Sequence, residues 1–163
     1  MDLLNALLLI VAANAAPVVA RLLLGRRFES PVDGGQLWFD QRPLFGSAKT
    51  LRGLLASLLV TTLLALLLGY GALLGFIVGV ATMCGDLLTS FVKRRFDLAA
   101  HHQLYGFDQF FETLLPLLVL QQPLDLSGRH LLLIYLAFTL LNVLLTYALH
   151  RSVWRKNRQA ERR

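Results

Sequence analysis

An aspartate inside an apolar stretch is the residue of this sequence that points most directly to a function. Asp86 lies about two helical turns before the basic run that begins at Lys93. In a bilayer, a carboxylate at that depth costs at least ~2.5 kcal/mol unless it is paired or hydrated. Helical spacing places Ser90 and Lys93 on the same face. We therefore interpret Asp86 as a functional acid, the alternative being an internal ion pair with Lys93 or another base.

Two further acids open the next apolar stretch. Asp108 and Glu112 are four residues apart and would share one face of a helix. A helix N-terminus favours acids through its dipole, which accounts for Asp108 without a function. Glu112 lies deeper and is harder to explain in this way. Carboxylates at such positions suit Mg²⁺, which prefers hard oxygen ligands.

The polar segment before the second apolar stretch supplies bases. It ends in the run Gly46-Ser47-Ala48-Lys49-Thr50. Small-residue amides beside a lysine, at the start of a helix, are typical of phosphate binding. The run is not a P-loop, because no glycine directly precedes Lys49. The alternative is a basic loop with ordinary turns that only sets membrane orientation.

The first apolar stretch also carries polar residues on one face. Asn14, Pro17 and Arg21 are spaced at i, i+3 and i+7. Pro17 leaves a backbone carbonyl near Asn14 without its helical partner. These residues would line a polar cavity, or they form a structural kink with a snorkelling Arg21. Acids for Mg²⁺, bases for phosphate and an apolar groove together favour phosphoryl or nucleotidyl transfer to a lipid phosphate.

The elements that would position these residues are membrane helices. Hydrophobic residues make up 56% of the 163-residue chain and charged residues only 16%, with a mean hydropathy of +0.59. A span needs about 20 apolar residues. We predict an all-α, polytopic membrane bundle with about five transmembrane helices, at Leu3–Leu24, Leu51–Leu68, Ala72–Val92, Phe107–Leu120 and His130–Leu149. The fourth is short and contains Pro116, but treating it as a span keeps the charge pattern consistent.

Lysine and arginine predict the orientation. The net charge is +6, and the bases lie almost entirely in the segments 25–50, 93–106 and 151–163, with Arg129 on the opposite side. The positive-inside rule makes these segments two cytoplasmic loops and a basic cytoplasmic tail. We expect one transmembrane domain over residues 1–163, multi-pass in the cytoplasmic (inner) membrane, with the N-terminus outside. The bases are explained by topology, so we predict no nucleic-acid partner. A glycine stripe in the third span permits a homodimer.

Six short segments, in this order, resemble the CDP-archaeol synthase family of small membrane cytidylyltransferases. They are NAAPV at 14–18, PVD at 31–33, FDQRPLFG at 39–46, KTLRG at 49–53, GDLLTSFVKRR at 85–95 and DQ at 108–109. The fifth is the most specific, and it also resembles the signature of the larger CDP-diacylglycerol synthases.

The resemblance implies that CTP and a lipid phosphate, archaeol-like or another glycerol lipid phosphate, yield a CDP-lipid and pyrophosphate with Mg²⁺. The enzyme would be a CTP-dependent phosphatidate-type cytidylyltransferase. By motif position, Asp86 and Asp108 would bind the metal and, with Lys93, form the catalytic set. The implied substrate-binding residues are Asn14, Asp33, Asp40, Arg42, Lys49, Thr50, Arg52, Ser90 and Arg94. The alternative is a non-catalytic lipid-binding protein or small subunit with a decayed site.

Overall fold

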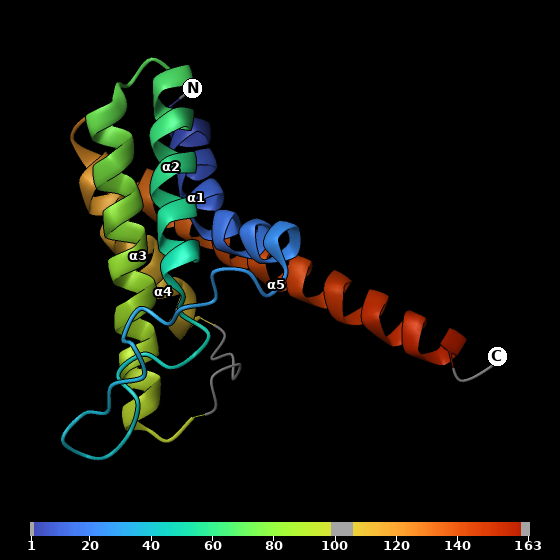
Figure 1. Cartoon of the computed structure of the whole chain (residues 1–163). Coiled ribbons are helices and arrows are strands. Elements are labelled where there is room, and N and C mark those ends of the chain that lie inside the picture. The colour runs from blue at the N-terminus through green and yellow to red at the C-terminus, as the bar shows by residue number, and fades with distance from the viewer. Residues whose placement is uncertain (1, 99–105, 161–163) are drawn as a thin grey trace.

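The chain forms five helices. The computed structural model describes residues 2–98 and 106–160, and the side chains of residues 145, 146 and 148–160 are outside the description. The helices are α1 (Asp2–Leu24), α2 (Leu51–Leu67), α3 (Ala72–Arg95), α4 (Phe107–Gln121) and α5 (Gly128–Ala160) (Figure 1). Within the described ranges the only extended pairing is two isolated β-bridges. The all-α prediction is confirmed.

Helix boundaries agree with the predicted stretches except at two ends. α3 continues through the basic run to Arg95, so the predicted loop 93–106 begins later than expected, and its residues 99–105 lie outside the described part of the chain. α5 continues to Ala160, through most of the segment that we expected to be a separate tail. Figure 1 shows this last helix leaving the bundle sideways.

Thr50 starts α2 at the place where the polar segment meets the bundle. Its backbone is extended (φ −113°), and its hydroxyl accepts a hydrogen bond from the Gly53 N–H at 3.2 Å. This is an N-cap, which satisfies one of the free amides of the first turn. α2 therefore begins at Leu51, directly after Lys49 and Thr50.

α3 is the centre of the bundle, in contact with α1, α2 and α4. A Cβ at Gly75 or Gly79 would come within 2.5 Å of Thr61 on α2, and one at Gly85 would overlap the Phe111 carbonyl of α4. Of the predicted glycine stripe at Gly71, Gly75 and Gly79, the last two therefore serve close packing inside one chain, whereas an added Cβ at Gly71 would meet nothing within 4 Å.

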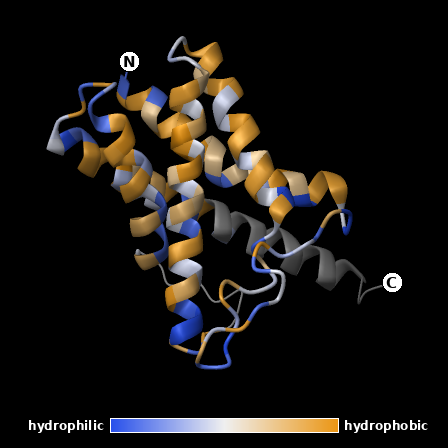
Figure 2. Cartoon of the chain, turned by 60° about the vertical axis from the view of Figure 1, so that its left-hand side comes forward, coloured by the Kyte–Doolittle hydropathy of each residue, from blue (hydrophilic) through white to orange (hydrophobic). Residues whose placement is uncertain are grey.

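Polar side chains are buried in the bundle beside a hydrophobic core, while large apolar side chains are exposed on its outside. Buried residues include Thr61, Thr82, Lys93 and Asp108, whereas Leu22, Leu23 and Leu67 are more than three-quarters exposed. Figure 2 shows the helices apolar over most of their length. Two described helices, α1 and α3, are long and apolar enough by themselves to cross a bilayer. α2 and the apolar part of α5 (Gly128–Leu144) are shorter.

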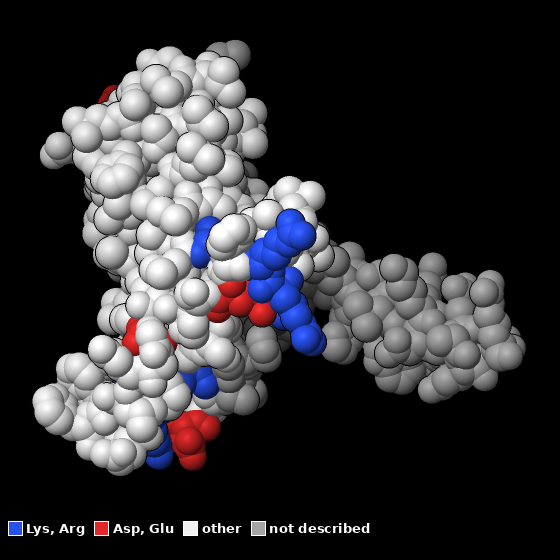
Figure 3. Space-filling model, in the orientation of Figure 1, with Lys and Arg blue, Asp and Glu red and all other residues white. Residues whose placement is uncertain are grey.

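Charged side chains gather at one end of the bundle. In Figure 3 they lie at the middle and lower end of the face, over the loops, and the upper half is almost free of them. The opposite end holds the start of α1 and the α2–α3 connection, joined by a hydrogen bond from the Tyr70 hydroxyl to Asp2 at 3.2 Å.

Candidate active site

A polar cavity of about 730 Å³ opens among the helices at the charged end. Its size suits a nucleotide-sized ligand. It is lined by seven of the predicted site residues, namely Asn14, Lys49, Thr50, Arg52, Asp86, Lys93 and Asp108. The other five are not among its lining residues: Asp33, Asp40, Arg42, Ser90 and Arg94.

Two lysine–aspartate ion pairs dominate the cavity. Lys49 Nζ lies 2.5 Å from Asp86 Oδ1, and Lys93 Nζ lies 3.0 Å from Asp108 Oδ2. The first pair joins the polar segment to α3, and the second joins α3 to α4. The ion pair that was the alternative interpretation of Asp86 is therefore present, and its partner is Lys49.

Glu112 completes the acidic lining. It lines the same cavity as Asp86, Asp108 and Lys49. The sequence marked Glu112 as unexplained but gave it no role. Only the structure shows that α4 turns it toward Asp86.

These carboxylates fit a Mg²⁺ ion that is bound together with a phosphate ligand. Among the described residues, no group of three or more His, Cys, Asp or Glu forms a metal cage of its own. Mg²⁺ ordinarily takes one or two protein carboxylates and completes its shell with phosphate oxygens and waters. Neighbouring carboxylates on α3 and α4 match that need.

Arg52 lines the cavity, but its guanidinium already has partners. It is 7% exposed and donates to the carbonyls of Gly25, at 2.9 Å, and Arg27, at 2.5 Å. Glu29 is 3.8 Å away. Arg52 thus ties the start of α2 to the chain that leaves α1. Phosphate binding by Arg52 stays a prediction, whereas these hydrogen bonds give Arg52 a structural role.

Asp33 lies outside the cavity and organises the polar segment. Its carboxylate accepts hydrogen bonds from the backbone N–H groups of Gly35, Phe45 and Gly46. Burial alone would raise the pKa of Asp33, but these backbone hydrogen bonds outweigh it and hold the pKa below its ordinary value of 3.8. The Gly46 amide that we expected to bind phosphate is therefore donated to Asp33.

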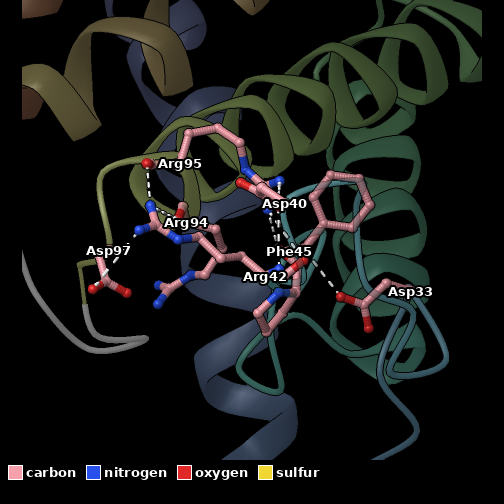
Figure 4. Close-up of polar contacts among 8 residues, drawn as sticks. Asp33, Asp40, Arg42, Phe45, Arg94, Arg95 and Asp97 are labelled. Atoms are coloured by element: carbon pink, nitrogen blue, oxygen red, sulfur yellow. Dashed lines mark hydrogen bonds and ion pairs between the residues drawn. The ribbon is translucent and has the colours of Figure 1, made fainter.

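Asp40, Arg42 and Arg95 fasten the same segment to the end of α3 (Figure 4). The Arg42 guanidinium donates to the Arg95 carbonyl, one of the free acceptors at this helix end. In return, Arg95 binds Asp40 Oδ1 at 2.5 Å and the Pro43 carbonyl at 2.6 Å. These side chains hold the loop in place rather than lining the cavity.

Arg94 and Ser90 are also absent from the residues that line the cavity. Arg94 donates to the Leu98 carbonyl, and its side chain lies against Gly46, where an added Cβ would be 3.6 Å from its Nε. Ser90 is 3% exposed. Conversely, Pro17 and Arg21 line the cavity together with Asn14, as their spacing predicted, whereas Glu29 and Asn142 line it without having been predicted. Asn142 is an amide inside the last apolar stretch, and this polar residue could have indicated that α5 contributes to the cavity.

Comparison with known proteins identifies the family. A family model described as CarS-like CDP-archaeol synthase matches residues 67–155. The CDP-archaeol synthase of Thermococcus onnurineus is 39% identical over 108 residues, which are 60% of this chain and 60% of that protein. That of Thermococcus gammatolerans is 35% identical over 78% of this chain and 77% of its own length, and that of Pyrobaculum calidifontis is 33% identical over 87% and 82%.

A solved structure agrees with the sequence relatives. It is described as an intramembrane enzyme for archaeal membrane lipid biosynthesis, with a TM-score of 0.73, 29% identity, and coverage of 88% of this chain and 91% of that one. The family model covers more than half of the chain, and the longer matches extend over most of it. On these grounds the chain belongs to the CDP-archaeol synthase family.

Proposed function

We propose that the protein transfers CMP from CTP to an archaeol-type lipid phosphate and releases pyrophosphate. The observation that carries this proposal is the cavity, where Lys49 and Lys93 stand beside Asp86 and Asp108 at the N-terminus of α2. The relatives named above are all CDP-archaeol synthases, which favours an ether-linked lipid phosphate over the acyl phosphatidate that the sequence left open.

The reaction needs positioning and charge neutralisation more than a covalent nucleophile. A lipid phosphate oxygen forms a bond to the α-phosphorus of CTP, and the bond from that phosphorus to the bridging oxygen of the β-phosphate breaks. The nucleophile is already anionic at neutral pH, so no general base is required. Lys49 and Lys93 are the groups of this chain that would hold the phosphates.

Mg²⁺ would supply charge neutralisation and would orient the triphosphate. Asp86 and Asp108 would hold it, with Glu112 beside Asp86. Both lysines now pair with these aspartates, so phosphate oxygens and aspartates compete for the same ammonium groups. Binding of the charged substrate therefore implies an exchange of ion-pair partners at both lysines.

We place the protein across the inner cell membrane with the cavity at the cytoplasmic face. Exposed leucines over the helices, the charged end of the bundle and the intramembrane relative support this placement. All five helices would contribute to the spans, with the N-terminus outside. The residues described as lining the cavity all belong to one chain, and the homodimer that the sequence permits stays a prediction.

The direct test is incorporation of [α-³²P]CTP by the purified protein with two lipid phosphates, one ether-linked and isoprenoid, the other diacyl. We expect a labelled CDP-lipid with the ether lipid, dependent on Mg²⁺. Preference for the diacyl lipid would overturn the substrate class. Absence of labelled lipid with either would favour a non-catalytic lipid-binding protein.

A further inference from the structure

We propose that Asp33 is a positioning residue, which acts on the reaction by holding the Lys49 backbone so that the lysine reaches into the cavity. Asp33 is not itself among the residues that line the cavity. The effect on turnover rests on the proposed function, whereas the effect on the polar segment does not. Asp33 was expected to bind substrate, so the inference assigns it a different role in the same reaction.

Both oxygens of the Asp33 carboxylate are used by the backbone. Oδ1 accepts from the Gly35 N–H at 3.0 Å, and Oδ2 accepts from Phe45 at 2.9 Å and Gly46 at 3.0 Å. The first bond forms a local turn, and the other two join segments that are twelve and thirteen residues apart in the chain. Figure 4 shows the carboxylate directed at Phe45. A carboxylate with three such bonds makes a strong closure, because charged acceptors bind N–H groups more tightly than neutral ones.

The residues beside Asp33 hold Lys49 itself. The Val32 N–H donates to the Lys49 carbonyl at 2.8 Å, and Pro31 forms an antiparallel bridge with Thr50. On its other side, the Lys49 N–H donates to the Gly46 carbonyl at 3.1 Å. Lys49 is thus attached through Val32 to one end of the Asp33 closure and through Gly46 to the other.

Gly46 places the loop that Asp33 closes against the Arg94 side chain of α3. Its φ of +90° lies in the region that favours glycine, and its Cα side packs against the Arg94 side chain. The Gly46 amide that Asp33 binds is therefore next to a contact with the helix that carries Asp86. Asp33, Gly46, Lys49 and Val32 are thus joined in a ring of hydrogen bonds. The side chain of Lys49 extends from this ring into the cavity, where it pairs with Asp86 at 2.5 Å.

A lysine needs such support because its side chain is long and flexible. If its backbone shifts by about an ångström, the ammonium no longer meets the phosphates, and misplacement of that size can cost about a hundred-fold in rate. Asp33→Asn keeps the size of the side chain, but its amide nitrogen cannot accept from the N–H groups on that side. Asp33→Ala removes all three acceptor bonds.

The test compares Asp33→Asn and Asp33→Ala with the matched control Asp97→Asn. Asp97 is an acid in a loop at the same end of the bundle, and its side chain is 82% exposed. Its ion pair with Arg42 is long, at 3.9 Å, so its loss should change little. Amide hydrogen exchange on the full-length protein in detergent should be faster at Val32, Phe45 and Gly46 in both Asp33 variants, more so in Asp33→Ala. Exchange in α2 and α3 should be unchanged. Asp97→Asn should match wild type throughout.

The functional arm uses a double-mutant cycle with Lys49→Ala. Asp33→Asn alone should lower kcat/KM for CTP by about a hundred-fold. In the Lys49→Ala background it should lower it no further, because Asp33 acts through Lys49. An equal further loss in that background would mean that Asp33 contacts substrate or metal directly, and would overturn the proposal.

Two other outcomes distinguish the positioning role of Asp33 from the proposed cytidylyl transfer. Unchanged exchange at Phe45 and Gly46 in Asp33→Ala would show that the closure does not organise the loop, and would also overturn the proposal. A wild-type protein that makes no CDP-lipid would overturn the proposed function alone, since hydrogen exchange needs no substrate. Asp33→Asn is the milder variant, and serves if Asp33→Ala does not fold.

Discussion

At the scale of single residues, Asp86 is the acid on which the proposed chemistry depends most. It is paired with Lys49, and Glu112 lines the same cavity. Asp86→Asn keeps the shape and removes the charge, so we expect CTP-dependent product to fall to background. The protein should remain folded, because Asn keeps the size of the side chain and the Lys49 side chain is partly exposed to solvent. Initial rates of CDP-lipid formation and a thermal melt measure the two effects.

Asp108→Asn should resemble Asp86→Asn, and the double variant should be little worse than either, because both acids would serve one metal. Asp2→Asn is the control, since Asp2 lies at the opposite end of the bundle. Substantial activity of Asp86→Asn at ordinary Mg²⁺ would show that the carboxylate is structural and that the mechanism is wrong.

Lys49 and Arg52 should behave differently although both are bases that line the cavity. Lys49→Ala should weaken CTP use with little loss of stability. Arg52→Ala should lower the free energy of unfolding by about 1.5–3 kcal/mol, the usual value of a hydrogen bond to a charged group, because the Gly25 and Arg27 carbonyls lose their donor. Denaturation curves beside CTP titrations separate the two. Equal stability of both variants would refute this division.

The lowered pKa of Asp33 should make the free energy of unfolding depend on pH in the acid range. Its pKa is lower in the folded chain than its ordinary value of 3.8. A lowered pKa contributes stability that is fully present above pH 3.8 and is lost as the pH falls through the folded-state pKa. The stability difference between wild type and Asp33→Asn should therefore be constant near neutrality and shrink in acid. A difference that grows as the pH falls would contradict the assignment.

At the scale of elements, the close approach of α3 to α4 sets the distance between the two predicted metal ligands. Gly85 precedes Asp86, and a Cβ there would overlap the Phe111 carbonyl, which is backbone and cannot move aside. Gly85→Ala should cost about 1–3 kcal/mol by overpacking, and should also lower activity by moving Asp86 from Asp108. Melting temperature and rate test both effects.

The control for Gly85→Ala is Gly128→Ala at the start of α5, where nothing lies within 4 Å of an added Cβ. It should leave both quantities near wild type. If Gly85→Ala is also silent, then α3 and α4 are free to separate, and the site tolerates that movement.

At the scale of the whole molecule, lysine and arginine predict which end faces the cytoplasm. The loops and the basic C-terminal segment carry nearly all of them, whereas Arg129 is alone on the other side. A reporter fused after Arg163 should read cytoplasmic and one inserted at Gly128 should read external. Opposite signals at both positions would reverse the model and place the cavity on the far side from CTP.

The sequence by itself determined the helical class, the order and approximate bounds of the helices, and the end of the bundle where chemistry gathers. These follow from local signals: apolar runs of spanning length, acids within them and bases between them. Among the predicted residues that line the cavity, Asp86 could be found because a carboxylate is costly inside an apolar stretch, and Lys49 because it follows small residues at the start of a helix. The continuation of α5 to Ala160 was not predicted, because a basic, polar segment can continue a helix without any apolar signal.

Only the tertiary structure decided which partner each charged group takes. Sequence spacing placed Lys93 near Asp86, yet Lys93 pairs with Asp108 on α4, and Asp86 pairs with Lys49 from a distant loop. Asp33, Arg42 and Arg52 have the residue types of a phosphate or metal site, yet they bind backbone groups instead. The physical reason is that a charged side chain inside a folded chain binds whichever complementary group the packing brings within 3 Å or so. That group belongs to another element, so no local pattern in the sequence identifies it.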